Sequence, residues 1–369
     1  MMATFESRAR DAGARTGVVT TSHGTFETPC FMPVGTRGAV KHLSSVDLAD
    51  LGAQVVLANT YHLMLRPGVD VVAALGGLHR FTGWNGHLLT DSGGYQIFSL
   101  EPRVDDEGAV FRSTYDGSSH RLTPESAADV QAAIGADIQM VLDVCPALPA
   151  EPDALRAAVD RTLDWAERGR RRFLDHDDAP GRQAQFGIVQ GGTDIELRRR
   201  AAERTVEIGF DGYAIGGLSV GEQRDLMLPA VAATTELLPA EQPRYFMGLG
   251  DPVGIVEAVA RGVDMFDCVL PTRLARHGTL LTSQGRLNLR RAEFGRDDGP
   301  LDPGFAASPA NGWSRGYLRH LLQVGEPTAA RICTLHNVAW LFDLMERTRR
   351  AIAAGTFDAL RAEINATWA

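Results

Sequence analysis

The stretch from Gly262 to Arg273 reads Gly-Val-Asp-Met-Phe-Asp-Cys-Val-Leu-Pro-Thr-Arg and sets a carboxylate, Asp267, inside an apolar run. A continuous apolar run without alternation favours a strand that is buried on both faces, as in a parallel sheet. A carboxylate in such a strand costs several kcal/mol unless it is paired, solvated or used in chemistry. Two interpretations follow. Asp267 is a nucleophile or an acid/base, or it caps a loop or pairs with Arg273 or Arg276.

Short apolar runs alternate with amphipathic helical patterns over most of the chain. Thr123 and Asp251 each precede a proline at a first helical position, and Thr193 with Glu196 has capping-box spacing. Roughly seven or eight alternating units imply parallel strands closed into a (β/α)8 TIM barrel, so the expected fold class is α/β. The candidate strands cover residues 54–58, 87–90, 138–142, 185–189, 212–215, 244–247 and 263–266.

The two ends of the chain depart from this alternation. Residues 17–29 indicate turn-rich β structure ahead of the barrel, and residues 301–312 are rich in Pro, Gly, Ala and Ser. Helical patterns follow at 315–325 and 337–354. We therefore expect a single barrel domain over residues 1–369 with an N-terminal antiparallel β extension and a C-terminal helical subdomain.

Composition excludes several classes of protein. No apolar stretch approaches the roughly 18–20 residues that a membrane span needs, and the start of the chain lacks a signal-peptide pattern. The four cysteines are scattered, without the spacing of a metal site or of a disulfide framework. We expect a cytoplasmic protein with no membrane partner.

Charge is unevenly distributed along the chain. The net charge of −9 argues against indiscriminate binding of polyanions, yet residues 269–296 hold six arginines and one acid, Glu293. The guanidinium fork suits phosphates and base edges, whereas a solvated face is the alternative interpretation.

Polar residues and glycines follow the candidate strands. In a barrel of this kind the active site lies at the carboxyl ends of the strands, so these residues are expected to converge on one mouth. They are Asn59, Thr60, His62, Asp91, Ser92, Gly93, Gly94, Tyr95, Asp143, Gln190, Gly191, Gly192, Gly216, Gly217, Gly248, Gly250 and Asp267.

A guanine-like base fits the chemistry of this mouth. Asp143 can accept from the N–H groups of the base, while the Gln190 amide and the Gly217 N–H can donate to its O6. Tyr95 and Met247 can stack on the two faces of the ring, although each alone is more typical of a core residue.

Two further carboxylates, Asp91 and Asp267, remain for chemistry. Exchange at a glycosidic bond with retained geometry uses one carboxylate as nucleophile and another as acid and base. These residue types therefore suit the exchange of a base on a ribose.

Together these motifs resemble the bacterial tRNA-guanine transglycosylase family, which inserts a 7-deazaguanine base at the wobble position of tRNA during queuosine synthesis. The matching segments occur in the family's order over nearly the whole chain. They are residues 28–36 (TPCFMPVGT), 59–68 (NTYHLMLRPG), 76–79 with Trp84, 90–100 (TDSGGYQIFSL), 187–192 (GIVQGG), 215–222 (IGGLSVGE), 245–250, 264–273 (DMFDCVLPTR), 283–289 and 335–337.

The resemblance implies a role for each matching residue. Asp267 would be the nucleophile that displaces guanine and leaves a covalent enzyme–RNA intermediate, and Asp91 would be the general acid/base. The base pocket would comprise Ser92, Gly93, Gly94, Tyr95, Asp143, Gln190, Gly216, Gly217, Leu218 and Met247, with Glu222 and the Leu218 carbonyl serving the exocyclic amine of the incoming base. The anticodon loop would contact Gly248, Leu249, Gly250, Asp251, Pro252, Val253, Gly254, Thr272, Arg273, Leu274, Ala275 and Arg276.

The resemblance also implies partners. We expect a tRNA anticodon loop, guanine and a 7-deazaguanine base as substrates, and a homodimer. Val220 and Cys145 match the bacterial pattern and favour 7-aminomethyl-7-deazaguanine, whereas Val144 stands where bacterial members usually have Glu.

One departure concerns zinc. The family has a Cys-x-Cys-x-x-Cys cluster and a distant histidine, but residues 304–310 read Gly-Phe-Ala-Ala-Ser-Pro-Ala here and only His336 remains. One histidine cannot hold a tetrahedral zinc ion. We therefore expect no metal ligands and no cofactor. Within the degenerate zinc-type subdomain near residues 283–340, the region 300–336 would then be held by apolar contacts of Phe305, Trp313 and Tyr317, or be mobile.

Two other functions stay open at this point. The first is a non-catalytic or repurposed RNA-binding relative, against which the retention of both Asp91 and Asp267 argues. The second is a barrel enzyme that acts on small glycosides, against which the arginine-rich segment at 269–296 argues.

Overall fold

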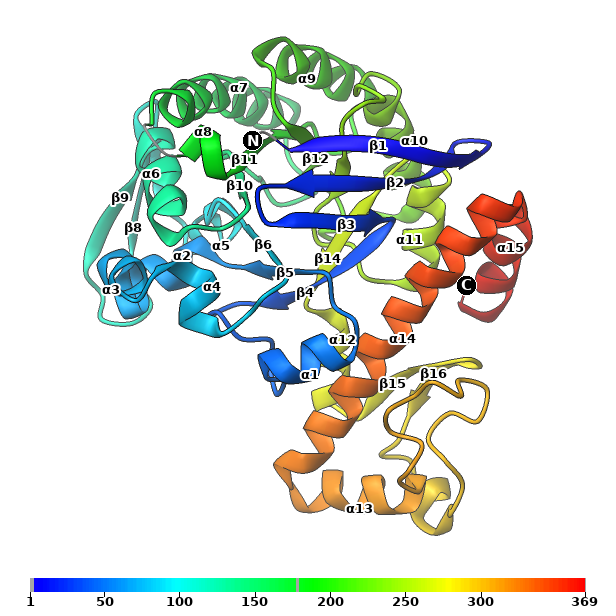
Figure 1. The fold of residues 1–369 in the computed structure, drawn as a ribbon. Coiled ribbons are helices and arrows are strands. Elements are labelled where there is room, and N and C mark those ends of the chain that lie inside the picture. The colour runs from blue at the N-terminus through cyan, green and yellow to red at the C-terminus, as the bar shows by residue number, and fades with distance from the viewer. Residues whose placement is uncertain (1–2, 177–178, 369) are drawn as a thin grey trace.

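Eight parallel strands close into a barrel in the computed structural model, which describes residues 3–176 and 179–368 (Figure 1). The predicted (β/α)8 barrel is therefore confirmed. In the order in which they pair around the barrel, the strands are β4 (Cys30–Gly35), β5 (Val55–Ala58), β6 (His87–Thr90), β10 (Ile138–Met140), β11 (Ala184–Val189), β12 (Gly212–Ile215), β13 (Arg244–Phe246) and β14 (Met265–Cys268).

The first barrel strand, β4, was not among the predicted strands. Pro29 precedes it and Pro33 lies within it, and proline weakens a strand pattern because it has no N–H to donate. The other seven strands lie at the predicted positions; β6 and β12 have the predicted bounds, and the remaining five have shifted ends. Strand β14 ends two residues later than predicted, at Cys268, so Asp267 lies within the strand.

Helices cover the outside of the barrel. They are α1 (Ser45–Asp50), α2 (Thr60–Leu63), η1 (Met64–Gly68), α3 (Val69–Ala74), α4 (Gly77–Thr82), α5 (Gly94–Phe98), α6 (Pro124–Ile134), α7 (Pro152–Leu174), α8 (Ala179–Arg182), α9 (Ile195–Ile208), α10 (Arg224–Thr235), α11 (Pro252–Val259) and α12 (Leu270–Arg276). The side chains of Thr123 and Asp251 cap α6 and α11 as predicted. The capping box of Thr193 with Glu196 was wrong, because Asp194 is one residue nearer to α9 and its carboxylate accepts from Leu197 N instead.

An antiparallel sheet precedes the barrel, as predicted. It consists of β1 (Thr4–Asp11), β2 (Ala14–Thr21) and β3 (Gly24–Thr28). Phe26 of this sheet shares a buried cluster with Ile138 and Met265, which begin β10 and β14. The sheet therefore covers the amino-terminal end of the barrel and leaves the carboxyl-terminal end to the loops. A second antiparallel sheet, β7 (Arg103–Asp105), β8 (Gly108–Arg112) and β9 (Ser119–Leu122), was not predicted.

The C-terminal part contains a hairpin and three long helices. These elements are β15 (Thr279–Thr282), β16 (Gly285–Asn288), the short η2 (Ala292–Arg296), α13 (Arg315–Val324), α14 (Pro327–Ala354) and α15 (Phe357–Trp368). Helix α14 runs from this subdomain back along the barrel (Figure 1). It begins at Pro327 rather than at the predicted residue 337, because proline is favoured at the first helical position. Helix α15 was not predicted.

The core of this subdomain differs from the expected one. Phe305 is buried as expected, but Trp313 is 38% exposed and Tyr317 is 46% exposed, so the expectation was wrong for both. Helix α13 buries Leu318, Leu321 and Leu322, and that choice of face turns Tyr317 outward. These leucines pack with residues such as Leu280, Leu289, Leu301, Ile332 and Cys333. Among the described residues, no helix is both long and apolar enough to cross a membrane.

Candidate active site

Three aspartates stand at the carboxyl-terminal rim of the barrel. Asp91 directly follows β6, Asp143 lies just beyond β10, and Asp267 is the second-last residue of β14. They are 8%, 5% and 9% exposed, respectively. Because all eight strands are parallel, their carboxyl ends meet at one rim, as the sequence analysis required of these residues.

Asp267 is held by two donors from β13 and the loop that follows it. Its Oδ1 accepts from the Tyr245 hydroxyl at 2.6 Å and from Gly248 N at 2.7 Å. Within the described chain its Oδ2 accepts no hydrogen bond, and neither Arg273 nor Arg276 forms an ion pair with it. Burial raises the pKa of Asp267, and its two hydrogen bonds oppose that rise. The carboxylate is therefore oriented through one oxygen and presents the other.

Asp91 is held by the start of α2. Its Oδ1 accepts from Thr60 N at 2.8 Å and from Gly93 N at 3.2 Å, and its Oδ2 accepts from the Asn59 amide. Burial raises the pKa of Asp91 to about 6, although these hydrogen bonds favour the ionised form. A carboxyl group with a pKa near 6 is suited to both giving and taking a proton close to neutral pH.

The two candidate catalytic carboxylates share one neighbour. Burial raises the pKa of the Tyr245 phenol well above its ordinary value, and the negative charges of Asp267 and Asp91 both add to that rise. Tyr245 therefore keeps its proton and donates a hydrogen bond to Asp267. The charges of both carboxylates therefore reach the same phenol.

A carboxylate–amide pair lies farther around the rim. Asp143 Oδ2 accepts from Gln190 Nε2 at 2.6 Å, and Asp143 Oδ1 accepts from Ser92 Oγ at 3.3 Å. Burial raises the pKa of Asp143 to about 6. Gln190 Oε1 is buried and has no hydrogen-bond partner among the described residues. The Gln190 amide therefore presents an acceptor, whereas the sequence analysis had assigned it a donor role toward O6.

Two glycines make room for this pair. A Cβ on Gly94 would lie 3.0 Å from Asp143 Oδ1, and a Cβ on Gly217 would lie 2.1 Å from Gln190 Oε1. Gly217 also has a φ of +65°, which favours glycine. The pair can occupy the rim only because neither position carries a side chain.

The remaining predicted pocket residues differ in what they present. Tyr95 on α5 is 63% exposed and Met247 is half-buried, so the ring of Tyr95 and the thioether of Met247 reach the surface of the rim. Leu218 is buried, so its side chain presents nothing to a ligand. Glu222 accepts from Ser219 N and from Val220 N at 3.0 Å, which folds the loop that follows β12.

The residues predicted to contact the anticodon loop fall into an exposed group and a buried group. Arg273 and Gly248 are exposed and Arg276 is partly exposed. Asp251 caps α11 and forms an ion pair with Arg224 at 2.7 Å. The side chains of Leu249, Pro252, Val253, Thr272 and Ala275 are buried, so these residues place α11 and α12 rather than present side chains to a ligand.

Exposed arginines continue this surface. Arg286, Arg290, Arg291 and Arg296 are all exposed, which fits the basic face that the sequence indicated. Arg290 donates to the carbonyls of His277 and Leu322, and Arg291 lies 3.7 Å from Glu293. No acid of the described chain pairs with Arg273, Arg276, Arg286 or Arg296.

Several supporting residues were missed by the sequence analysis. Arg198 on α9 is fully buried and donates to the carbonyls of Val189, Gly192 and Gly216, which fixes the loops that carry Gln190 and Gly217. Its signal was an arginine on the apolar face of a predicted helix. Tyr245 was part of a matched segment but was given no role, and Asn59 was expected at the mouth but not as the partner of Asp91; both hydrogen bonds cross between strands.

A basic aromatic group at the rim was also missed. The guanidinium carbons of Arg37 and Arg66 lie 5.3 and 4.7 Å from the centre of the Tyr115 ring. His62 Nδ1 lies 3.0 Å from the Tyr115 hydroxyl. Arg37 follows β4, His62 and Arg66 follow β5, and Tyr115 lies in the turn between β8 and β9, so no short motif could have joined them.

His336, the remaining residue of the family's zinc site, is bonded on both sides of its ring. Its Nδ1 lies 2.7 Å from Ser308 Oγ, and its Nε2 lies 2.6 Å from the Leu281 carbonyl. Burial lowers the pKa of His336 to about 4. The imidazole is therefore neutral, and both of its nitrogens are used by protein groups.

A (β/α)8 barrel with two buried carboxylates at its carboxyl rim, beside a carboxylate–amide pair, has the features of an enzyme that acts on a glycosidic bond. The family described as queuine tRNA-ribosyltransferase matches residues 11–369. Relatives with that name include proteins of Solidesulfovibrio magneticus, 49% identical over 99% of this chain and 98% of the relative, and of Desulfosudis oleivorans, 52% identical over 95% and 92%. A third, from Symbiobacterium thermophilum, is 48% identical over 100% of this chain and 92% of the relative. The chain belongs to the queuine tRNA-ribosyltransferase family.

Proposed function

We propose that this chain replaces guanine at the wobble position of a tRNA anticodon with a 7-deazaguanine base, through a covalent aspartyl–ribose intermediate. It is a tRNA-guanine transglycosylase, a pentosyltransferase of queuosine biosynthesis. The observation that carries the mechanism is the pair Asp267 and Asp91. Asp267 presents an oxygen that accepts no hydrogen bond from the described residues, and Asp91 has a pKa of about 6.

The exchange takes place in two displacements. Asp267 Oδ2 attacks C1′ of the ribose, the C1′–N9 bond breaks, and Asp91 gives its proton to the departing guanine. The incoming base then loses a proton to Asp91, its nitrogen forms a bond to C1′, and the ester bond to Asp267 breaks. Asp91 ends protonated as it began, so each step balances and the cycle needs no cofactor.

The carboxylate–amide pair is assigned to base recognition. Asp143 accepts from the N–H donors of the guanine edge, and the unbonded Gln190 Oε1 adds a second acceptor. Tyr95 and Met247 cover the ring faces. The incoming base is 7-aminomethyl-7-deazaguanine, whose amine is met by the Leu218 carbonyl and the Glu222 loop.

The exposed arginines are assigned to the tRNA. Arg273 and Arg276 lie on α12, directly after the strand that carries Asp267, and so stand beside the reacting ribose. The other arginines of residues 286–296 extend this surface into the C-terminal subdomain and suit phosphate contacts. The family acts on tRNA, and we place that activity in the cytoplasm.

The C-terminal subdomain is proposed to hold no zinc at the family's cysteine position. Both nitrogens of His336 are already bonded, and Ser308 supplies one of the partners. The exposed Trp313 and Tyr317 leave an apolar surface that fits a homodimer contact. Sedimentation of the purified protein tests that dimer.

Trapping of the covalent intermediate tests the function. The protein is mixed with unmodified tRNA and a guanine analogue, and a denaturant-stable adduct is sought on a gel. We expect an adduct with the wild type and with the exposed-site control Asp298→Ala, and none with Asp267→Ala. An adduct with Asp267→Ala would refute the assignment of Asp267 as the nucleophile. Failure of the wild type to incorporate labelled guanine would favour the non-catalytic, RNA-binding alternative.

A further inference from the structure

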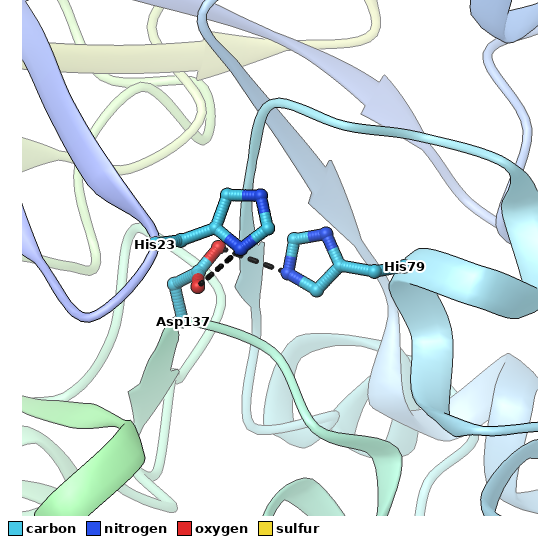
Figure 2. A group of neighbouring side chains, drawn as sticks. All are labelled: His23, His79 and Asp137. Carbon is cyan, nitrogen blue, oxygen red and sulfur yellow. Dashed lines mark ion pairs between the residues drawn. The ribbon is translucent and has the colours of Figure 1, made fainter.

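A second group of chemically active side chains lies at the opposite end of the barrel. His23 is in the turn between β2 and β3, His79 is on α4, and Asp137 immediately precedes β10. Figure 2 shows the two imidazoles turned toward the carboxylate. The ligand atoms of the three residues all lie within 4.8 Å of one another. None of them belongs to the active site, which lies at the carboxyl ends of the strands.

The distal nitrogens of both imidazoles are donors. His23 Nε2 lies 3.0 Å from the Asn85 carbonyl, and His79 Nδ1 lies 3.2 Å from the Trp84 carbonyl. A carbonyl oxygen can only accept, so each of these nitrogens carries the hydrogen. In the neutral ring the other nitrogen then has a free lone pair, and this is the nitrogen that faces Asp137.

Three acceptors therefore face one another. His79 Nε2 lies 3.1 Å from Asp137 Oδ2, and His23 Nδ1 lies 3.9 Å from Asp137 Oδ1. His79 Nε2 is buried and makes no hydrogen bond with any described group. Lone pairs that converge without a donor between them call for a cation.

We propose that His23, His79 and Asp137 bind a divalent transition-metal ion, with Zn²⁺ as the ion that suits two imidazoles and one carboxylate, and that water completes the coordination. The donor set is the kind that zinc takes at sites with an open position. Ligating histidines commonly donate their other ring N–H to a backbone carbonyl, as both do here. No metal ligands were expected from the sequence because the family's zinc cysteines are absent; His23, His79 and Asp137 are far apart along the chain and form no motif.

Two of the ligands are held in place and the third can adjust. Asp137 is buried and its Oδ2 also accepts from Leu88 N at 2.7 Å, while His79 is partly buried on a helix. In a tetrahedral site with bonds of about 2.0–2.1 Å, ligand atoms lie about 3.4 Å apart. His23 is exposed at the tip of a turn and its ring stacks on that of His79 with centroids 4.2 Å apart, so its side chain must turn out of this stack to close the longer gap.

The ion would join three separate parts of the fold. It would fasten the β2–β3 turn to α4 and to the start of β10, at the end of the barrel that the N-terminal sheet covers. An ion that binds the folded state alone raises the unfolding temperature by mass action. The expected consequence is therefore thermal stability that depends on metal, independent of the proposed base exchange.

A proton is the competing occupant of this group. Burial lowers the pKa of His79 and the Asp137 carboxylate raises it, with a net rise. A protonated His79 would then form an ion pair with Asp137, and His23 would take no part in that pair. The neighbouring His87 does not complete the group, because its Nδ1 lies 3.1 Å from Thr21 Oγ1.

Titration of the full chain with Zn²⁺ tests the proposal. The protein is stripped with a chelator, dialysed and titrated with Zn²⁺ by calorimetry, and Co²⁺ is added in a parallel sample for its visible absorption. The variants are His23→Gln and His79→Gln, with His320→Gln, an exposed histidine on α13, as the matched control. Circular dichroism checks that each variant folds, and exposed His23 is the position least able to disturb folding.

We expect one Zn²⁺ per chain for the wild type and for His320→Gln, and an affinity at least about tenfold lower for both other variants. The chelator should lower Tm of the wild type but not of His23→Gln. The proposal is overturned if the wild type binds no ion, or if both variants bind as tightly as the control. If added Zn²⁺ leaves the titration of His79 unchanged, the group holds a proton rather than a metal ion, and the proposal is again overturned.

Discussion

Replacement of Asp143 by Asn should stabilise the protein at neutral pH. Burial raises the pKa of Asp143 from its ordinary value of 3.8 to about 6, so the folded state holds the proton more tightly than the unfolded state does. Between these two values the folded state binds more protons, and the free energy of unfolding therefore falls as pH rises. The stability contributed by the protonated form is fully present below about pH 4 and is lost above about pH 6.

The magnitude follows from the size of the pKa change. One pKa unit corresponds to 1.36 kcal/mol, so a rise from 3.8 to about 6 represents about 3 kcal/mol at pH 7. Asn cannot ionise, and its amide oxygen can still accept from Gln190 Nε2. We therefore expect Asp143→Asn to be up to about 3 kcal/mol more stable than the wild type at pH 7 and about equal to it at pH 4.

Urea unfolding at pH 4, 5, 6 and 7 measures this difference. Asp298→Asn, at an exposed aspartate, is the matched control and should leave the stability difference near zero at every pH. The variant should lose base recognition at the same time. Its kcat/KM for guanine should fall about ten- to a hundredfold, because a hydrogen bond to a charged group contributes about 1.5–3 kcal/mol. A wild type that is more stable than Asp143→Asn at pH 7, or a difference that does not change with pH, would refute the reasoning.

Three further predictions concern the catalytic pair and the C-terminal subdomain. Tyr245→Phe removes the 2.6 Å hydrogen bond to Asp267 and should slow adduct formation about tenfold in single turnovers; an unchanged rate would contradict this role. In the wild type, adduct formation should slow as pH rises through about 6, because the proton of Asp91 is lost there, whereas Asp91→Asn should be slow and independent of pH; a parallel pH profile in the variant would exclude Asp91 as the acid. His336→Ala breaks both ring hydrogen bonds and leaves a void, so it should lower the free energy of unfolding by about 2–4 kcal/mol, measured by urea unfolding. A loss of less than about 0.5 kcal/mol would show that this ring does not hold the subdomain.

The barrel was predictable because its strands and helices alternate with clear boundaries. Prolines next to Thr123 and Asp251 marked two helix starts correctly, since a proline at the first helical position has a simple local cause. Strand β4 was missed for an equally local reason, because Pro33 interrupts its pattern while its neighbours in the barrel supply the pairing. The exposure of Tyr317 likewise depends on its surroundings, because α13 turns its leucines toward the core of the C-terminal subdomain.

The site was predictable in its charged residues but not in their support. Asp91 and Asp143 stand out in the sequence because each follows an apolar run. Their partners Asn59 and Gln190 directly follow the neighbouring strands β5 and β11, and the pairing of strands is a property of the closed barrel. Arg198 is a stronger case, because its position on the apolar face of α9 indicates burial but does not reveal the three carbonyls that its guanidinium binds.

Strand β14 shows why a buried aspartate needs its surroundings before it can be assigned a role. Asp264 precedes the strand and Asp267 lies within it, and both are buried. Asp264 accepts two hydrogen bonds from Arg15, at 2.9 and 2.6 Å, so its charge is neutralised within the protein. This is the paired, structural arrangement that the sequence allowed for Asp267, and it occurs three residues earlier. Asp267 has only the neutral donors Tyr245 and Gly248, so its charge remains for a ligand. Because a buried carboxylate without a cationic partner destabilises the fold, its presence at the rim supports the proposed role of Asp267 as the nucleophile.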